Sequence, residues 1–164
     1  HIVSMSVFCV AGAFQFSPAL RARRRWHRAA GRVLLPLGFV AAVSGAWLAV
    51  FFGGPDEEFP LAMVRLFFSA VMLVFLTMSA IAIVRRDFTA HGSWSTRAFA
   101  IAVSGGTQAL VSILWTIPFG EPDASGETWV VGAGFVLNCL VAEVIIRRRV
   151  AATSRAAERG ALVS

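Results

Sequence analysis

Long apolar runs alternate with short polar connections along the whole chain. Five of these runs approach or exceed the ~20 residues that a membrane-spanning helix needs. They cover residues 2–20, 29–52, 60–84, 95–119 and 128–146. The runs are apolar on all sides rather than along one stripe, which is typical of helices that face lipid. The pattern therefore predicts an all-α, polytopic transmembrane helix bundle over residues 1–149, with a disordered tail over 150–164.

The composition supports a lipid environment. Hydrophobic residues make up 57% of the chain and charged residues only 15%, whereas an ordinary soluble domain carries about 25% charged residues. The mean hydropathy is +0.73. A soluble domain of 164 residues has too little interior to bury so much apolar surface, so the composition argues against a soluble protein.

The polar connections alternate in charge. Residues 21–28, residues 85–94 and the tail from 147 are rich in arginine, whereas 53–60 and 120–129 contain no basic residue. Fourteen of the fifteen basic residues fall on the first side, and all fifteen are arginine. Because cytoplasmic loops carry the excess of basic residues, we expect this side and the C-terminus to be cytoplasmic in a bacterial inner membrane.

The net charge of +6 does not indicate a nucleic-acid-binding protein. A DNA-binding domain gathers its arginines on one groove-facing element, but here they recur at every second helix boundary. Anionic lipid headgroups are the expected partner of these arginines.

Small residues and polar residues inside the runs predict how the helices pack. Small residues spaced four apart within 38–49, together with the glycines of 105–106 and 132–134, favour close helix approach. Polar groups at membrane depth are candidates for function, and they are Gln15, Arg65, Gln108, Asn138 and Glu143. We expect the amides to form interhelical hydrogen bonds and Glu143 to pair with Arg147 four residues on. For Arg65, contact with headgroups and an inward role are equally open.

Two histidines form the candidate site. His27 begins the second run and His91 precedes the fourth, so both lie at the arginine-rich surface. Asp87 stands four residues before His91 and is placed to orient the ring or to join it as a ligand. Gly31, four residues after His27, leaves a flat space on the same helix face. Three arginines are candidates for holding carboxylate or phosphate groups there: Arg28, Arg32 and Arg97.

Several interpretations of this pair stay open. The histidines are interfacial residues, or axial ligands of a b-type haem in an electron-transfer protein, or, with Asp87, ligands of a zinc-like ion for hydrolysis. The alternative class is a non-catalytic membrane component, an assembly factor or an accessory subunit with membrane-protein partners. His1 lies ~30 Å away on the other side and cannot complete the same site.

Two long motifs carry a family resemblance. "HIV" followed by "GAFQFSPALRARRRWHRAAGRV", and "RRDFTAHGSWSTRAFAI" followed by "GTQ", "N" and "AE", resemble motifs of a family of predicted bacterial membrane proteins, domain-of-unknown-function family 2306. The resemblance implies a multi-helix membrane protein with one more helix upstream of His1, and no established activity. Gly92 and Ser95 depart from the basic residue and the methionine usual after the second histidine. The positions that match are His1, Gln15, His27, Arg28, Gly31, Arg32, His91, Trp94, Arg97, Gln108, Asn138 and Glu143.

Overall fold

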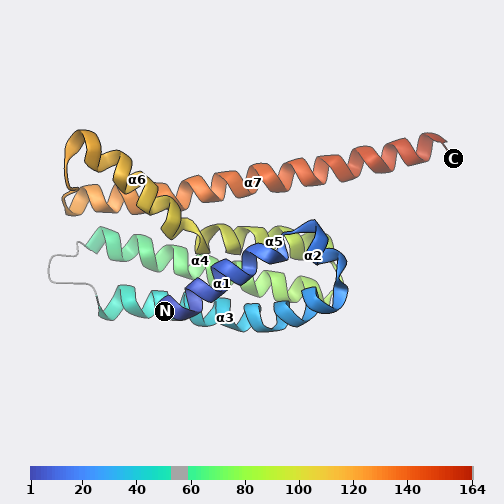
Figure 1. Ribbon diagram of the computed structural model, residues 1–164, viewed down its shortest axis with the longest axis horizontal. Coiled ribbons are helices and arrows are strands. Elements are labelled where there is room, and N and C mark those ends of the chain that lie inside the picture. Colours follow the sequence, from blue (N-terminus) through green and yellow to red (C-terminus); the bar gives the residue numbers. More distant parts are fainter. Residues whose placement is uncertain (53–58, 164) are drawn as a thin grey trace.

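The chain is all α-helical in the computed structural model (Figure 1). The structure describes residues 1–52 and 59–163, with 156–163 as backbone alone, so the acidic segment 53–58 lies outside the described residues. The helices within the described ranges are α1 (Ile2–Gln15), α2 (Pro18–Ala22), α3 (Arg24–Phe51), α4 (Phe59–Val84), α5 (Phe88–Ala102), α6 (Ser104–Phe119) and α7 (Ala124–Val163).

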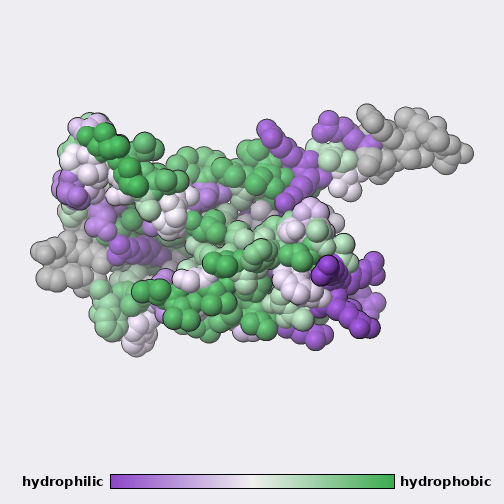
Figure 2. All heavy atoms as spheres, in the orientation of Figure 1, coloured by the Kyte–Doolittle hydropathy of each residue, from purple (hydrophilic) through white to green (hydrophobic). Residues whose placement is uncertain are grey.

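Three continuous helices are long and apolar enough to cross a membrane. These are α3, α4 and the part of α7 from Ala124 to Arg155. They confirm the predicted runs at 29–52, 60–84 and 128–146, and with them the polytopic membrane bundle. Figure 2 shows apolar side chains over much of the visible face of the bundle, with hydrophilic side chains gathered at the end where α2 lies and a second group toward the opposite end. This distribution is the one that a lipid-embedded bundle requires.

The fourth predicted run, 95–119, is a broken helix rather than a straight one. The α5 and α6 helices meet at Val103 with a bend of 42°. Only together are they long and apolar enough to cross a membrane. Ser104 follows the break, and its Oγ donates to the Ile101 carbonyl at 2.7 Å. A Cβ added to Gly105 or Gly106 would meet nothing within 4 Å. The glycine pair therefore contributes no close packing, contrary to the prediction, and instead follows a Ser/Gly-type kink.

The first predicted run, 2–20, does not form one long helix. The α1 helix has 14 residues and ends at Gln15. Ser17 takes an extended conformation, with φ −66° and ψ 123°, because the ring of Pro18 disfavours helical geometry in the residue before it. The prediction of five long spans is therefore wrong for the described residues: they hold three helices long and apolar enough to span, one bent helix pair and the short apolar helix α1.

Small residues of α3 let its neighbours approach closely, as the spacing predicted. A Cβ on Gly38 would lie 2.7 Å from Cε2 of Phe8 in α1 and 3.2 Å from the methyl groups of Leu76 in α4. Ala41 is fully buried. The α4 helix contacts α3, α5 and α7, and thus lies at the centre of the bundle. The core around it is formed by Phe8, Leu34, Ala42, Met72, Leu76, Ala98, Ile101 and Ala102.

The α7 helix continues well past the bundle. It runs to Val163 and projects beyond the ends of the other helices (Figure 1). The segment 150–163, predicted to be disordered, is helical. Its alanine and arginine content explains this, because both residues have high helix propensity.

Candidate functional site

The candidate site lies at the arginine-rich end, where the first turns of α3 and α5 meet the last turns of α4. His27 lies in the first turn of α3 and His91 in the first turn of α5. The structure therefore places the two histidines that the sequence analysis singled out at the same end of the bundle.

Ser79 of α4 fixes the ring of His91. The His91 Nδ1 atom lies 3.2 Å from the Ser79 carbonyl oxygen and 2.9 Å from its Oγ. Ser95 Oγ completes the group at 2.8 Å from Ser79 Oγ. A carbonyl oxygen can only accept, so this contact favours a proton on Nδ1. The lone pair of Nε2 is then left for a ligand, the arrangement typical of metal-binding histidines.

His27 presents a nitrogen that the rest of the described chain does not satisfy. Its Nδ1 is buried and has no hydrogen-bond partner there. Buried polar atoms are paired in the large majority of cases, so an unpaired one points to an ordered water or a bound group. Gly31, one turn further along α3, has nothing within 4 Å of an added Cβ. The space predicted beside His27 is present.

Asp87 caps a helix. As the N-cap of α5 it accepts a hydrogen bond from the Ala90 backbone N–H at 2.9 Å, which satisfies one of the free donors of the first turn. Among the described residues, no group of three His, Cys, Asp or Glu side chains is arranged to hold a metal ion. A zinc-like site with Asp87 as third ligand therefore has no ligand set there.

The arginines near the histidines divide into two kinds. Arg28 and Arg32 are exposed at the bundle end. Arg97 is instead bound by Glu143 of α7, through Nε to Oε1 and through Nη2 to Oε2 at 3.1 Å. Its guanidinium also lies 4.7 Å from the centre of the Trp94 ring. Arg97 is thus engaged within the protein, unlike the anion-holding role predicted for it.

The contact between Arg97 and Glu143 shows that the predicted partner of Glu143, Arg147, is wrong. Glu143 pairs across helices with Arg97 rather than with Arg147 in its own helix. The bidentate fork gives two charge-assisted hydrogen bonds, which an i,i+4 pair on one helix rarely matches. Arg147 contributes only a longer-range attraction.

The other polar groups at depth differ in their partners. Asn138 Nδ2 of α7 donates to Thr107 Oγ1 of α6 at 2.8 Å, which confirms the predicted interhelical bond. Gln108 Nε2 instead donates to Ser104 Oγ within its own helix at 3.3 Å, so the interhelical bond predicted for it is wrong. Arg65 of α4 pairs with Glu127 of α7 at 3.2 Å, and both side chains are partly exposed, 37% and 50%.

Gln15 differs from the other amides. Its Nε2 is buried and, like His27 Nδ1, has no hydrogen-bond partner in the described part of the chain. Two residues of the site were missed by sequence reasoning: Ser79 and Ser95. A serine facing a histidine across two helices leaves no pattern along the sequence, although Ser95 stands at a position where the chain departs from the family motif.

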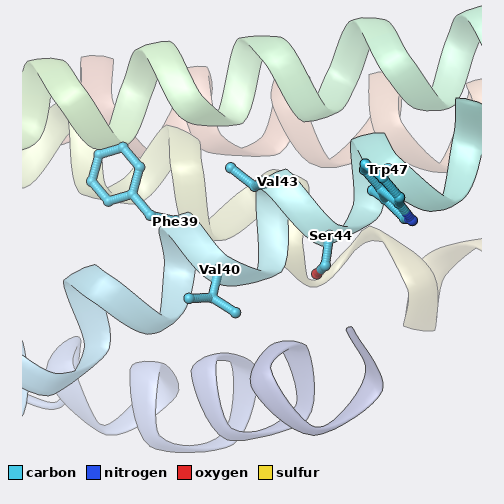
Figure 3. Close-up of a pocket in the computed structure, with 5 residues that line it drawn as sticks. All are labelled: Phe39, Val40, Val43, Ser44 and Trp47. Carbon is cyan, nitrogen blue, oxygen red and sulfur yellow. The ribbon is translucent and has the colours of Figure 1, made fainter.

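His1 lies apart from this site. Its Nδ1 contacts the Ala41 carbonyl at 3.0 Å and Ser44 Oγ at 3.1 Å, and Ala41 is ~21 Å along α3 from His27. Ser44 also borders a shallow apolar groove that Figure 3 shows, and no lining residue of the groove is titratable. The residues that line the groove are Phe39, Val40, Val43, Ser44 and Trp47.

The chain matches a known family model over most of its length. Residues 1–146 match the family model described as "Predicted membrane protein (DUF2306)". No curated protein and no solved structure matches the chain significantly. The match includes both histidines and the helices that position them. The chain therefore belongs to the predicted membrane protein family DUF2306.

Proposed function

We propose that this membrane protein binds a b-type haem between His27 and His91 and transfers electrons through it. The observation that carries the proposal is the contact of His91 Nδ1 with the Ser79 carbonyl, because it leaves Nε2 as a free ligand atom. Two imidazoles from different helices of a bundle are a common way to hold haem iron. When bound, the haem supplies one-electron chemistry.

The surroundings of the two rings fit such a group. Within the described part of the chain, His27 has a buried nitrogen without a partner, and an added Cβ on Gly31 or Gly92 meets nothing within 4 Å. A flat macrocycle needs close approach to backbone, which glycine allows. Arg28 and Arg32, both exposed at this end, are suited to neutralise the haem carboxylates. Ser79 holds the His91 ring in the ligating orientation.

The test is an optical spectrum of the full chain purified in detergent and supplemented with haemin. We expect a Soret band with low-spin, six-coordinate features. His27→Ala and His91→Ala should each abolish that spectrum. The control His1→Ala should preserve it, because His1 contacts α3 far from His27. A wild-type protein without a Soret band overturns the proposal and favours a non-catalytic membrane component. A spectrum that survives in both alanine variants moves the ligands elsewhere.

The proposal includes an orientation in the bacterial inner membrane. The arginine-rich end faces the cytoplasm and contacts anionic headgroups, in accord with the basic residues at 21–28 and 147–149. Single cysteines at the exposed positions Ser125 and Ser154, in a chain lacking Cys9 and Cys139, test this. A membrane-impermeant reagent should label position 125 in intact spheroplasts and position 154 only after lysis. The reverse result overturns the orientation.

A further inference from the structure

Two buried side-chain nitrogen atoms, on two different helices of this bundle, have no hydrogen-bond partner among the described residues. They are Nε2 of Gln15, at the end of α1, and Nδ1 of His27, in the first turn of α3. The large majority of buried side-chain polar atoms are paired, so each exception calls for a specific explanation. The position of Gln15 relative to the histidines decides whether the two atoms belong to one site.

The contacts between α1 and α3 place Gln15 near His27. His1 contacts Ala41, and Phe8 lies against Gly38, so the two helices run antiparallel. Gln15 is seven residues after Phe8 and therefore on the same face of α1. Continuing this register by two turns places it beside Gly31, one turn from His27 on the same face of α3.

The contacts between α1 and α5 place Gln15 near the helix that carries His91. Cys9 Sγ donates to the Ala102 carbonyl at 3.4 Å. A Cβ on Gly12 would lie 2.8 Å from the Phe99 ring, and the Phe16 ring centre is 4.9 Å from that of Phe99. The end of α1 therefore packs against the second half of α5, with Phe99, eight residues after His91, as its main contact. Gln15 thus stands between the two helices that present the histidines.

We propose that Gln15 is a third binding residue of the site, whose carboxamide donates a hydrogen bond to a carboxylate oxygen of the haem. The inference rests on the proposed function. A carboxamide nitrogen can only donate, so a buried Nε2 without a partner requires an acceptor from outside the described chain. The haem b carboxylates are strong acceptors, and hydrogen bonds to ionised groups are the stronger ones. His27 and His91 would hold the iron, and Gln15 would hold one carboxylate of the haem through its side-chain nitrogen.

The test is the affinity for haemin of Gln15→Met, which keeps the length of the side chain and removes the donor. We expect binding about tenfold weaker than in the wild type, the factor that the loss of one hydrogen bond to a charged group produces. The Soret position should not change, since both axial ligands remain. The control Phe14→Leu alters a neighbouring side chain that is 52% exposed and should bind like the wild type.

A second variant covers a failure of Gln15→Met to fold. Gln15→Glu keeps size and polarity but places a carboxylate against a carboxylate, so its affinity should fall further than that of Gln15→Met. Wild-type affinity in either variant overturns the role of Gln15 and assigns a water to its Nε2. That result leaves the haem proposal intact if His27→Ala and His91→Ala still lose the spectrum. A wild-type protein that binds no haemin overturns both proposals.

Discussion

Two polar clusters lie between the helices of this bundle, and they differ in whether their side-chain nitrogens have hydrogen-bond partners. In the α6–α7 cluster, the side-chain nitrogens of Gln108 and Asn138 both donate to side-chain oxygens. In the cluster at the arginine-rich end, nitrogens of Gln15 and His27 have no partner among the described residues. A cluster that uses all its donors stabilises packing. A cluster that leaves buried nitrogens unpaired is suited to bind something else.

The glycines of the two clusters differ in the same sense. A Cβ on Gly134 in α7 would lie 2.5 Å from Cγ of Gln108 and 3.2 Å from its backbone nitrogen. A Cβ on Gly31 would meet nothing within 4 Å. Gly134 is therefore needed because two helices touch there, whereas Gly31 leaves space beside a histidine.

Exchanging each glycine for leucine gives the largest expected difference between the clusters. Gly134→Leu should lower the free energy of unfolding by about 3 kcal/mol, because the backbone of α6 must move. Gly31→Leu should change it by less than about 0.5 kcal/mol, yet it should abolish haemin binding by filling the space beside His27. SDS-induced unfolding in mixed micelles measures the first effect, and haemin titration the second. Equal destabilisation by both substitutions contradicts the comparison.

The ion pair between Arg97 and Glu143 is predicted to be structural. Arg97→Met should destabilise the protein by about 2 kcal/mol, because it leaves a carboxylate unpaired between helices; the figure is reduced for the partial exposure of both side chains, 23% and 38%. The double variant Arg97→Met/Glu143→Leu should recover at least half of this loss in the same unfolding assay. Additive losses in the double variant contradict an interaction between the two.

Ser79 is predicted to act through His91. Ser79→Ala removes the hydroxyl but keeps the carbonyl, so haemin should bind about tenfold more weakly, while a Soret band remains. Ser93→Ala is the control, since Ser93 Oγ donates to Thr89 within α5 and not to the histidine. An unchanged affinity in Ser79→Ala, measured by haemin titration, contradicts the role of the hydroxyl.

The smallest expected effect belongs to Asn138. Asn138→Leu removes its hydrogen bond to Thr107 and should cost about 0.6 kcal/mol of unfolding free energy, an average value for interhelical bonds in membranes. It should leave haemin affinity unchanged. A loss of haemin binding in this variant would place the α6–α7 cluster in the site and end the distinction between the two clusters.

Much of the fold follows from hydropathy alone. The α3, α4 and α7 spans correspond closely to apolar runs, because in lipid the backbone must be satisfied within each helix. Hydropathy cannot predict where a helix ends inside an apolar run. Pro18 ends α1 through the conformation of the residue before it, and the α5–α6 break depends on local hydrogen bonding around Ser104. Both interruptions divide segments that are apolar throughout.

The site was only partly predictable. The charge asymmetry of the connections and the positions of the histidines predicted that His27 and His91 lie at the same surface. In the structure both lie in the first turns of their helices at the arginine-rich end. The partner of Glu143 was predicted from spacing along one helix, but Arg97 on another helix offers a bidentate fork. The unpaired nitrogen of Gln15 depends on what surrounds it in three dimensions, which no spacing along the chain can express.

Because α7 is one continuous helix, it restricts the bend between α5 and α6. Asn138 attaches α7 to α6 on one side of the bend, and Glu143 attaches it to α5 on the other. The continuous helix α7 is thus bound to both halves of the bent pair α5–α6. A change in the 42° angle between α5 and α6 at Val103 would move one of these two contacts relative to the other. The angle can therefore change only if α7 loses its contact with α5 or with α6.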